Sequence, residues 1–382
     1  MDALASIGNA RSMASFAASS LTAALLATVA LTGCSDDSRS GGAAGAGAGA
    51  GAPTSSGDGG DASGPASSGA GAAGAAGGRG SGGGGGAPVS LRVAVISDLN
   101  DSYGSTTYGD AVHQAVAAIA GQVKPDLVLV TGDMVAGQQA GLDYEAMWAG
   151  FHAAVTAPLR DAGIPLAVTP GNHDASGYAA FEGEREIFAA QWQLPENVPG
   201  VEMIDGSSYP LRYSFVHRGA FFLSLDATTI GPLSQEQRDW AAAQLDGAAA
   251  YPVKIAYGHV PLHSVAVGRE EEILGDDALE GIFRDHGLTA YISGHHHAYY
   301  PGARDGLRLV SMACLGSGPR ALIGTEGATP RALLQVDIED GVVTSLEALL
   351  APGFSEVIDR GTLPGELRHG GKSVMRDDLA GF

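Results

Sequence analysis

Acidic, amide and imidazole side chains recur in this sequence directly after short apolar runs. Each run is rich in β-branched residues, which is typical of a buried strand. The polar residues that follow these runs are Asp98, Asp133, Asn172, His259, and His295 with His297. Carboxylate oxygen, amide oxygen and imidazole nitrogen are ligands for ions such as Mn, Fe or Zn, and none of these positions offers a thiolate. The spacing therefore predicts a metal centre assembled from several distant segments.

Two metal ions close together need at least one shared ligand, and a carboxylate such as Asp133 can bridge them. Such a pair, about 3.5–4 Å apart, lowers the pKa of a bound water molecule and stabilises the oxygens of an in-line displacement at phosphorus. We therefore expect two divalent or trivalent ions, drawn from Mn, Fe and Zn. Glycine precedes Asp133, His259 and His295, which lets the backbone turn sharply and come close to the ions.

Strands and helices must alternate to position these side chains. Apolar runs at 91–97, 127–131 and 166–169 are separated by helical stretches near 110–119 and 143–161, which is typical of parallel βαβ units. Ligands of such sheets gather outside the carboxyl ends of the strands. Further strands are expected at 213–217, 221–226, 252–257, 289–293, 307–312, 333–338 and 342–349, with a helix that begins at Ser234 and runs to Leu245. The pattern predicts a mixed α/β domain with two sheets or one very large sheet.

The order of the motifs resembles the calcineurin-like metallophosphoesterase superfamily. The family pattern is Asp-x-His, Gly-Asp, Gly-Asn-His-Asp/Glu, a later His and then Gly-His-x-His, and the resemblance covers roughly residues 91–350. The helix start at 233–240 also resembles the purple-acid-phosphatase-like branch. This resemblance implies a four-layer α/β/β/α sandwich with two central mixed sheets, with the metals between the carboxyl ends of the two sheets.

The resemblance also implies a role for each residue. One site would use Asp98, Asp133 and His297, and the other would use Asp133, Asn172, His259 and His295. His173, next to Asn172, would act on the substrate phosphate as a general acid or as a stabiliser of the transition state. A hydroxide that bridges the metals would be the nucleophile, and the reaction would be hydrolysis of a phosphomonoester or a phosphodiester.

The first motif departs from the family pattern at its third position. It reads Asp98-Leu-Asn100, where the family usually has His. Purple acid phosphatases also lack that His but place a Tyr three residues after the bridging Asp, and that position is Ala136 here. Asn100 would ligate only as a neutral amide oxygen, which predicts a more loosely held first metal or an oxygen-rich shell. Tyr103 and Tyr108 are nearby alternative donors.

Composition separates the first quarter of the chain from the rest. The 382 residues include 21 basic and 42 acidic side chains, and glycine accounts for 21 of the 46 residues from 41 to 86. A Gly-, Ala- and Ser-rich segment has too little apolar surface to offset the entropy of ordering. We therefore expect the fold to begin near residue 90, with a net charge near −19. Such an acidic domain disfavours nucleic-acid binding through a basic patch, and it favours a small phosphorylated substrate.

The N-terminus has the features of an export signal. An apolar stretch at 16–31 is too short for a membrane span, and the Leu-Thr-Gly-Cys run that ends at Cys34 resembles a bacterial lipobox. The resemblance implies a lipid on Cys34 and an outer-membrane lipoprotein of the cell envelope that faces the periplasm or the surface. An ordinary signal peptide is the alternative. The expected organisation is a signal peptide at 1–33, the acylated Cys and tether at 34–89, the metallophosphoesterase domain at 90–352 and a tail or wrap at 353–382.

Two other functions stay open at this point. The chain could be a non-catalytic metal- or phosphate-binding envelope lipoprotein with a weakened first metal site, or an adhesin-like module whose purpose is the Gly-rich stalk. His173 favours an enzyme, because a pure binding protein does not need a proton donor. The sequence points to no particular oligomeric state.

Overall fold

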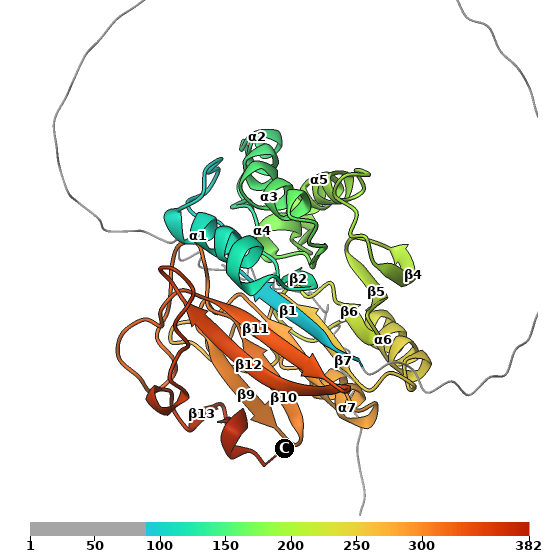
Figure 1. Cartoon of the computed structure of the whole chain (residues 1–382), viewed down its shortest axis with the longest axis vertical. Coiled ribbons are helices and arrows are strands. Elements are labelled where there is room, and N and C mark those ends of the chain that lie inside the picture. The colour runs from blue at the N-terminus through green and yellow to red at the C-terminus, as the bar shows by residue number, and fades with distance from the viewer. Residues whose placement is uncertain (1–88, 382) are drawn as a thin grey trace, which may run out of the picture. The chain divides into compact units, whose positions relative to one another are not determined.

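Two β-sheets form the centre of the fold in residues 89–381, the part of the chain that the computed structural model describes (Figure 1). The first sheet has the order β12-β11-β1-β2-β3. Its strands are β1 (Leu91–Ile96), β2 (Leu127–Val130), β3 (Leu166–Val168), β11 (Ala332–Glu339) and β12 (Val342–Leu350). β1, β2 and β3 are parallel, and β11 and β12 join them as antiparallel strands.

The second sheet has the order β13-β14-β9-β10-β8-β7-β6-β5-β4. Its strands are β4 (Glu202–Ser208), β5 (Arg212–His217), β6 (Ala220–Ser224), β7 (Lys254–Gly258), β8 (Ala290–Ser293), β9 (Tyr300–Arg304), β10 (Leu307–Ser311), β13 (Glu366–His369) and β14 (Lys372–Arg376). β6, β7, β8 and β10 run parallel to one another, and the remaining pairs are antiparallel. Both sheets are mixed, as predicted.

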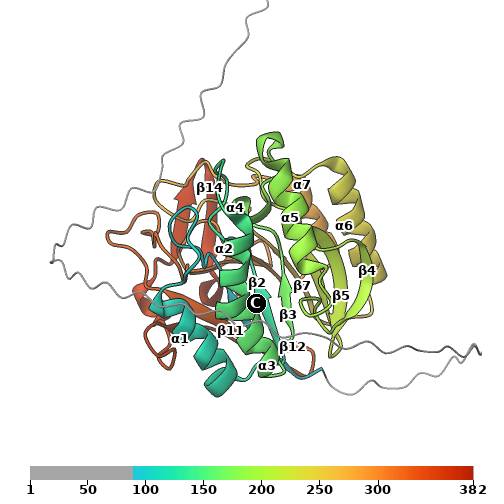
Figure 2. The same ribbon diagram turned by 90° about the horizontal axis from the view of Figure 1, so that it is seen from above.

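Helices cover the outer faces of the two sheets (Figures 1 and 2). Those over the first sheet are α1 (Asp110–Ala118), η1 (Ile119–Val123), α2 (Tyr144–Phe151), η2 (His152–Thr156), α3 (Ala157–Asp161) and α5 (Glu182–Trp192), and those over the second are α6 (Gln235–Gly247) and α7 (Asp277–Asp285). The remaining short helical turns are α4 (Asn172–Ala175), η3 (Ala179–Phe181), η4 (Arg360–Thr362) and η5 (Asp377–Leu379).

The side chains of β1 show why the molecule has four layers. Ala94 and Ile96 pack under the helices with Trp148 of α2, whereas Val93 and Val95 pack between the two sheets. Both faces of the strand are therefore buried, which explains why its sequence from Val93 to Ile96 is a continuous apolar run rather than an alternating one. A third apolar layer joins the second sheet to α6 and α7. The α/β/β/α sandwich that the resemblance implied is confirmed.

Side-chain caps fix where the longer helices begin. The Ser234 hydroxyl accepts a hydrogen bond from the amide of Gln237 at 3.2 Å, at the start predicted from the sequence. Asp143 and Asp276 cap α2 and α7 in the same way. Each cap satisfies one of the amides that the first turn of a helix leaves without an intrahelical partner.

Several elements were not anticipated from the sequence, among them β4, β9, α5 and α7. The segment after residue 352, expected as a tail or wrap, contains β13 and β14, and β14 pairs with β9 at the end of the second sheet. These strands are short and carry many polar residues, because they lie at a sheet edge with one face toward solvent.

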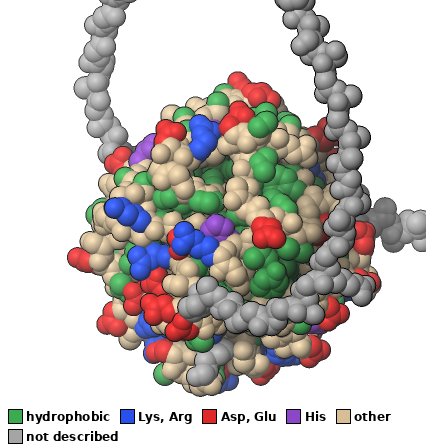
Figure 3. Space-filling model, turned by 45° about the vertical axis from the view of Figure 1, so that its right-hand side comes forward, with side chains coloured by type: hydrophobic (Ala, Val, Ile, Leu, Met, Phe, Trp, Pro, Cys, Tyr) green, Lys and Arg blue, Asp and Glu red, His purple; other side chains and the backbone are tan. Residues whose placement is uncertain are grey.

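The predicted signal peptide, Cys34 and the tether up to residue 88 lie outside the described residues. Within residues 89–381, no helix combines the length and the apolar character that crossing a bilayer requires. On the face drawn in Figure 3, basic side chains stand among acidic ones rather than in one broad patch.

Candidate metal centre

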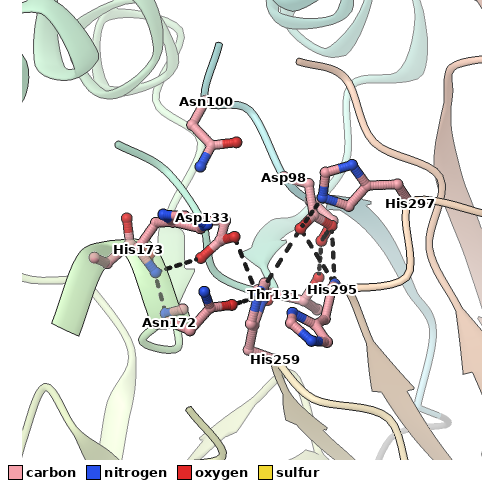
Figure 4. Close-up of polar contacts among 12 residues, drawn as sticks. Asp98, Asn100, Thr131, Asp133, Asn172, His173, His259, His295 and His297 are labelled. Carbon is pink, nitrogen blue, oxygen red and sulfur yellow. Dashed lines mark hydrogen bonds and ion pairs between the residues drawn. The ribbon is translucent and has the colours of Figure 1, made fainter. Parts of the chain in front are cut away.

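Five parallel strands, from both sheets, deliver the predicted site residues to one place (Figure 4). Asp98 follows β1, Asp133 follows β2 and Asn172 follows β3, while His259 follows β7 and both His295 and His297 follow β8. Asp98, Asp133 and His297 are buried, and each offers an atom that lies within 4.8 Å of the atoms offered by the other two. The carboxyl ends of the two sheets therefore meet at a cluster with the donor set of a metal site.

Sharp turns after the strands aim these side chains inward. Asp98, Asp133, His295 and His297 all have left-handed backbone conformations, with φ of 49°, 54°, 65° and 52°. This conformation is uncommon for residues other than glycine and persists where the surrounding structure holds it. Here the Asp98 amide donates to the Gly132 carbonyl at 3.1 Å, which ties the turn after β1 to the turn after β2.

Glycine is required where these turns touch. A Cβ on Gly171 would lie 2.1 Å from the backbone nitrogen of Asp133, and a Cβ on Gly294 would lie 2.2 Å from the Ser97 hydroxyl. Both contacts are far shorter than real Cβ atoms make. The glycines before Asn172 and His295 are therefore needed because neighbouring segments approach too closely for a side chain.

The Asp174 carboxylate fastens the loop after β2 to the loop after β3. One oxygen accepts from the amides of Met134 and Val135 at 2.7 and 2.8 Å, and the other accepts from the amide of Gly171 at 3.0 Å. The side chain is fully buried. Burial and the neighbouring Asp133 raise the pKa of Asp174 to about 8. The fourth residue of the Gly-Asn-His-Asp run therefore positions the loops that carry the two predicted ligands Asp133 and Asn172.

Two of the imidazoles are held so that one nitrogen faces the oxygen atoms of the cluster. His259 Nδ1 lies 2.8 Å from the Thr131 carbonyl and His297 Nδ1 lies 3.0 Å from the Gly318 carbonyl. A carbonyl can only accept, so each Nδ1 carries a proton and donates it. His259 Nε2 then faces the Asn172 Oδ1 at 2.9 Å and an Asp133 oxygen at 3.3 Å, and His297 Nε2 faces an Asp98 oxygen at 3.2 Å.

This arrangement fits a metal ion. In the neutral imidazole, the lone pair of Nε2 would point at oxygen lone pairs, which repel it unless a cation lies between them. A backbone carbonyl that holds the opposite ring nitrogen is the usual way in which metal-binding histidines are oriented. The donors are carboxylate, amide oxygen and imidazole, a mixture that suits Mn, Fe or Zn.

The charges of the cluster are strongly coupled. Burial opposes ionisation of Asp98, but the adjacent His297 outweighs it and holds the pKa of Asp98 below its usual range. Burial likewise disfavours the charged form of His259, yet the Asp133 and Asp98 carboxylates raise the pKa of His259 to about 9. The carboxylates that stabilise a proton on this imidazole are equally placed to stabilise a divalent cation.

Hydroxyl groups hold the Asp98 carboxylate from behind. The Ser97 hydroxyl donates to an Asp98 oxygen at 2.6 Å, and the Thr131 hydroxyl donates to the Ser97 oxygen at 2.6 Å. The backbone amide of His295 lies 3.2 Å from each Asp98 oxygen. Asp98 is therefore fixed by groups that follow three strands, and the same carboxylate also faces His297 at 3.2 Å and His259 at 4.0 Å.

His295 is placed differently from the other two imidazoles. Its ring lies 5.1 Å from the His259 ring, centre to centre, but its Nε2 lies 3.0 Å from a carboxylate oxygen of Glu272. His296 anchors the segment that carries Glu272, because its Nε2 donates to the Glu272 carbonyl at 3.0 Å and its Nδ1 accepts from the amide of Val265 at 3.2 Å. The middle His of the triplet thus has a structural role, and Glu272 is an addition to the predicted site.

Asn100 lies beside the cluster without bonding to it. Its amide nitrogen donates to the Val135 carbonyl at 3.2 Å, and Figure 4 draws no contact from it to the carboxylates or imidazoles. The Tyr108 hydroxyl does not face the cluster as a donor atom, since it donates a hydrogen bond to the Met134 carbonyl at 2.7 Å. Tyr103 is 39% exposed and lies against His173 with the ring centres 5.4 Å apart.

His173 is half-buried at the edge of the cluster. Its backbone amide donates to an Asp133 oxygen at 2.9 Å, and its Nδ1 lies 3.1 Å from the Gly137 carbonyl. Because Nδ1 must donate to that carbonyl, Nε2 is the ring nitrogen left for a substrate. The position next to the predicted bridging carboxylate is suited to proton transfer at a bound phosphate.

Sequence reasoning missed the side chains that support the cluster, chiefly Asp174, Gln138 and Glu272. Gln138 accepts a hydrogen bond from the Asn172 amide nitrogen at 3.1 Å. Asp174 had a local signal, because it completes the Gly-Asn-His-Asp run. Gln138 and Glu272 stand in loops, with nothing in their neighbouring residues to mark them.

Comparison with known proteins gives a consistent picture. The family model described as calcineurin-like phosphoesterase matches residues 91–299, which is more than half of the chain. A protein of Arabidopsis thaliana named as a metallophosphoesterase is 23% identical over 229 residues, which are 54% of this chain and 30% of that protein. A purple acid phosphatase from yellow lupin (Lupinus luteus) seeds superposes with a TM-score of 0.52 at 16% identity, covering 72% of this chain and 53% of the lupin chain. The chain therefore spans about half or less of the length of these relatives.

Proposed function

This chain belongs to the calcineurin-like phosphoesterase family, and from that premise we propose that it is a dinuclear metal-dependent hydrolase of a phosphomonoester or phosphodiester. The observation that supports this most directly is the pair of imidazoles, His259 and His297, whose Nε2 atoms face carboxylate and amide oxygens. One ion would be held by Asp98, Asp133 and His297, and the other by Asp133, Asn172, His259 and His295.

Bound metal ions would supply an acidified water molecule and would neutralise charge on the phosphoryl oxygens. The protein's own contribution is to hold the donors rigidly. The Asp133 carboxylate is fixed by the His173 amide on one oxygen and faces His259 with the other, so it is suited to serve both ions. Rigid donors need no reorganisation as charge develops in the transition state.

His173 is proposed to act on the leaving group of the substrate. The Gly137 carbonyl holds its Nδ1 and leaves Nε2 to face the substrate. As an imidazolium it would donate a proton to the departing oxygen, and its positive charge would stabilise the phosphoryl oxygens in the same position. A protein that only binds phosphate could use the charge of this imidazole, but it would have no use for the proton on Nε2.

Hydrolysis of model substrates tests the proposal. The full chain, loaded with Mn²⁺, is expected to hydrolyse p-nitrophenyl phosphate or bis-p-nitrophenyl phosphate, and Asp133→Asn is expected to lower kcat/KM more than about 100-fold, since even residues that merely support metal ligands contribute 10–100-fold. Asp101→Asn, an exposed carboxyl three residues beyond Asp98, is the control. Lack of hydrolysis of both substrates under metal saturation would overturn the proposal.

The rival function is a metal- or phosphate-binding protein without turnover, for which the altered first motif at Asn100 is the favouring observation. His173→Ala separates the two. An enzyme is expected to lose about 10²–10⁴-fold in kcat while the metal content stays the same. A binding protein would show no hydrolysis in either form, whatever the substitution does to its phosphate affinity.

We also propose that the chain is exported and anchored by a lipid on Cys34, as a lipoprotein of the cell envelope. The support is the Leu-Thr-Gly-Cys run after an apolar stretch, in a chain with only two cysteines. Expressed in a bacterial host, the chain is expected in the membrane fraction and labelled by radioactive fatty acid. Cys34→Ser should abolish the label. An unlabelled wild-type chain would favour the ordinary signal peptide.

A further inference from the structure

The amide side chain of Asn172 has a partner that decides which of its two ends faces the cluster. Its Nδ2 donates to Gln138 Oε1 at 3.1 Å, and its Oδ1 faces His259 Nε2 at 2.9 Å. Asn172 is 9% exposed, so this orientation is set by protein groups rather than by solvent. Only the oxygen of a carboxamide can ligate a metal ion, because the amide nitrogen has no available lone pair.

We infer that Gln138 is a positioning residue that fixes Asn172 as an oxygen donor to the second metal ion, an inference that rests on the proposed function. If the Asn172 amide rotated by half a turn, its oxygen would meet the Gln138 oxygen and its NH₂ group would face the site. That rotation would place two acceptors in contact and leave a buried donor without a partner, each of which is costly. Gln138 therefore disfavours the state that cannot bind metal.

Gln138 is itself held in place by a network on the far side from the cluster. Its backbone amide donates to a Glu184 oxygen at 2.9 Å, and its side-chain amide donates to the Ser176 hydroxyl at 3.1 Å. The same Glu184 oxygen accepts from the Tyr144 hydroxyl. Gln138 also has a left-handed backbone, with φ of 63°, a conformation that is uncommon for residues other than glycine. The loop after β2 is thus fixed by groups from α2 and α5.

The same short segment orients His173. The Gly137 carbonyl accepts from His173 Nδ1, and the Gly137 amide donates to the His173 carbonyl at 3.0 Å. Gly137 and Gln138 therefore act on two consecutive residues of the site, one through the backbone and the other through its side chain. The effect of Gln138 can be isolated, because its side chain can be changed without altering the Gly137 contacts.

Metal affinity measured by calorimetry tests the inference. Gln138→Met keeps the length of the side chain and removes the acceptor, so the Kd of the Mn²⁺ at the second site, the ion that Asn172 would ligate, is expected to rise about 10–100-fold. Gln138→Glu retains an acceptor for the Asn172 NH₂ group and is expected to restore most of the affinity. Gln139→Met, at the exposed neighbouring position, should match the wild type. Absorption of the Co²⁺-loaded protein should change in Gln138→Met and be preserved in Gln138→Glu, since it reports the donor set.

Each outcome decides a different claim. If Gln138→Met binds Mn²⁺ as tightly as Gln139→Met, the inference is wrong while the proposed function stands. If Gln138→Met and Gln138→Glu are equally weakened, Gln138 acts by packing rather than as an acceptor, and the inference is again wrong. A wild-type chain that binds no Mn²⁺ overturns both the proposed function and the inference.

Discussion

Asn100 occupies the position where the family pattern has a histidine, and its side chain offers the first metal position a weaker ligand. The Asn100 nitrogen is used by the Val135 carbonyl, which leaves a neutral oxygen as the only available donor. An amide oxygen is a weaker ligand than imidazole for Mn, Fe or Zn. The first metal position is therefore expected to bind its ion less tightly than a site with the family's full motif.

Restoring the histidine tests this expectation. Asn100→His is expected to tighten the first Mn²⁺ by about 10-fold, equivalent to about 1.4 kcal/mol, measured by competition with a chelator of known affinity. Asn100→Ala is the control and should leave the metal as weakly held as in the wild type, or weaker. Two tightly held ions whose occupancy does not respond to either substitution would contradict the proposed role of Asn100.

Gly294 tests how closely the segments of the site are packed. A Cβ there would lie 2.2 Å from the Ser97 hydroxyl and 2.7 Å from an Asp98 oxygen, so it would separate the two groups that hold each other. Gly294→Ala is expected to lower the free energy of unfolding by about 1–3 kcal/mol and to weaken metal binding. Chemical denaturation of the metal-free and metal-loaded protein measures both effects.

The matched control is Gly281→Ala in α7. A Cβ at Gly281 would meet nothing within 4 Å, and its φ is ordinary. Alanine in a helix interior is expected to stabilise the protein by about 0.5–1 kcal/mol relative to glycine. If Gly294→Ala stabilises the protein as Gly281→Ala does, a Cβ at position 294 does not clash, and the close packing inferred there is wrong.

At the scale of elements, a buried carboxylate couples α7 to the second sheet. Glu280 on α7 is 2% exposed, and its oxygens lie 2.9 Å from His263 Nε2, 3.3 Å from an Arg304 nitrogen on β9 and 3.4 Å from an Arg284 nitrogen. Burial opposes ionisation, but His263 and the two arginines outweigh it and hold the pKa of Glu280 below its usual range.

Because the pKa of Glu280 is lowered in the fold, the stability of the protein is expected to fall at acid pH. A carboxyl whose pKa is lower in the folded state stabilises the fold above its unfolded pKa of about 4.3, and that contribution is lost as the pH falls through the folded pKa. Glu280→Gln is expected to lower the free energy of unfolding by about 2 kcal/mol at pH 7. Below pH 4 the difference in stability between the variant and the wild type should become smaller. Glu271→Gln, whose side chain is 89% exposed, is the control and should change stability by less than about 0.5 kcal/mol. A Glu280→Gln defect that is equal at pH 7 and pH 3.5 would contradict the argument.

The sequence predicted those elements that are buried on both faces, and it missed those at the edges. β1, β2 and β7 consist mainly of apolar residues because helices or a second sheet cover each face, so their types and approximate bounds were predictable. β4 has an alternating, largely exposed pattern, and β13 and β14 carry Arg, His and Lys. Their strand conformation depends on pairing with distant strands, which local composition does not record.

The residues of the site also divide into those that could be predicted and those that could not. Each predicted ligand lies in the short segment that follows a buried strand, so its position could be inferred from the strand it follows. The residues that hold the ligands could not, because Gln138 meets Asn172 from 34 residues away and Asp174 meets Met134 from 40 residues away. Such contacts depend on how two loops pack, and no spacing in the sequence encodes that.

At the scale of the whole molecule, the acidic charge and the metal centre have to be considered together. The chain carries a net charge of −21, which repels phosphorylated polymers at a distance. Two divalent ions would offset only a small part of it, and they would do so at the carboxyl ends of the sheets. We therefore propose a small phosphorylated substrate, attracted by the metal centre itself, rather than a polyanion bound along a basic groove.

The Gly-rich segment before the domain gives the last test, which distinguishes an enzyme on a tether from a stalk that is itself the functional part. All contacts described for the site join residues between Ser97 and Gly318, so none depends on residues 43–86. Deleting 43–86 is expected to leave kcat/KM for p-nitrophenyl phosphate unchanged. For a chain anchored through Cys34, as proposed, the deletion would shorten the segment between the lipid and the domain, so it should instead reduce access to large substrates. Loss of hydrolysis of the small substrate would contradict the enzyme reading, because a spacer has no means of altering a site built entirely within the folded domain.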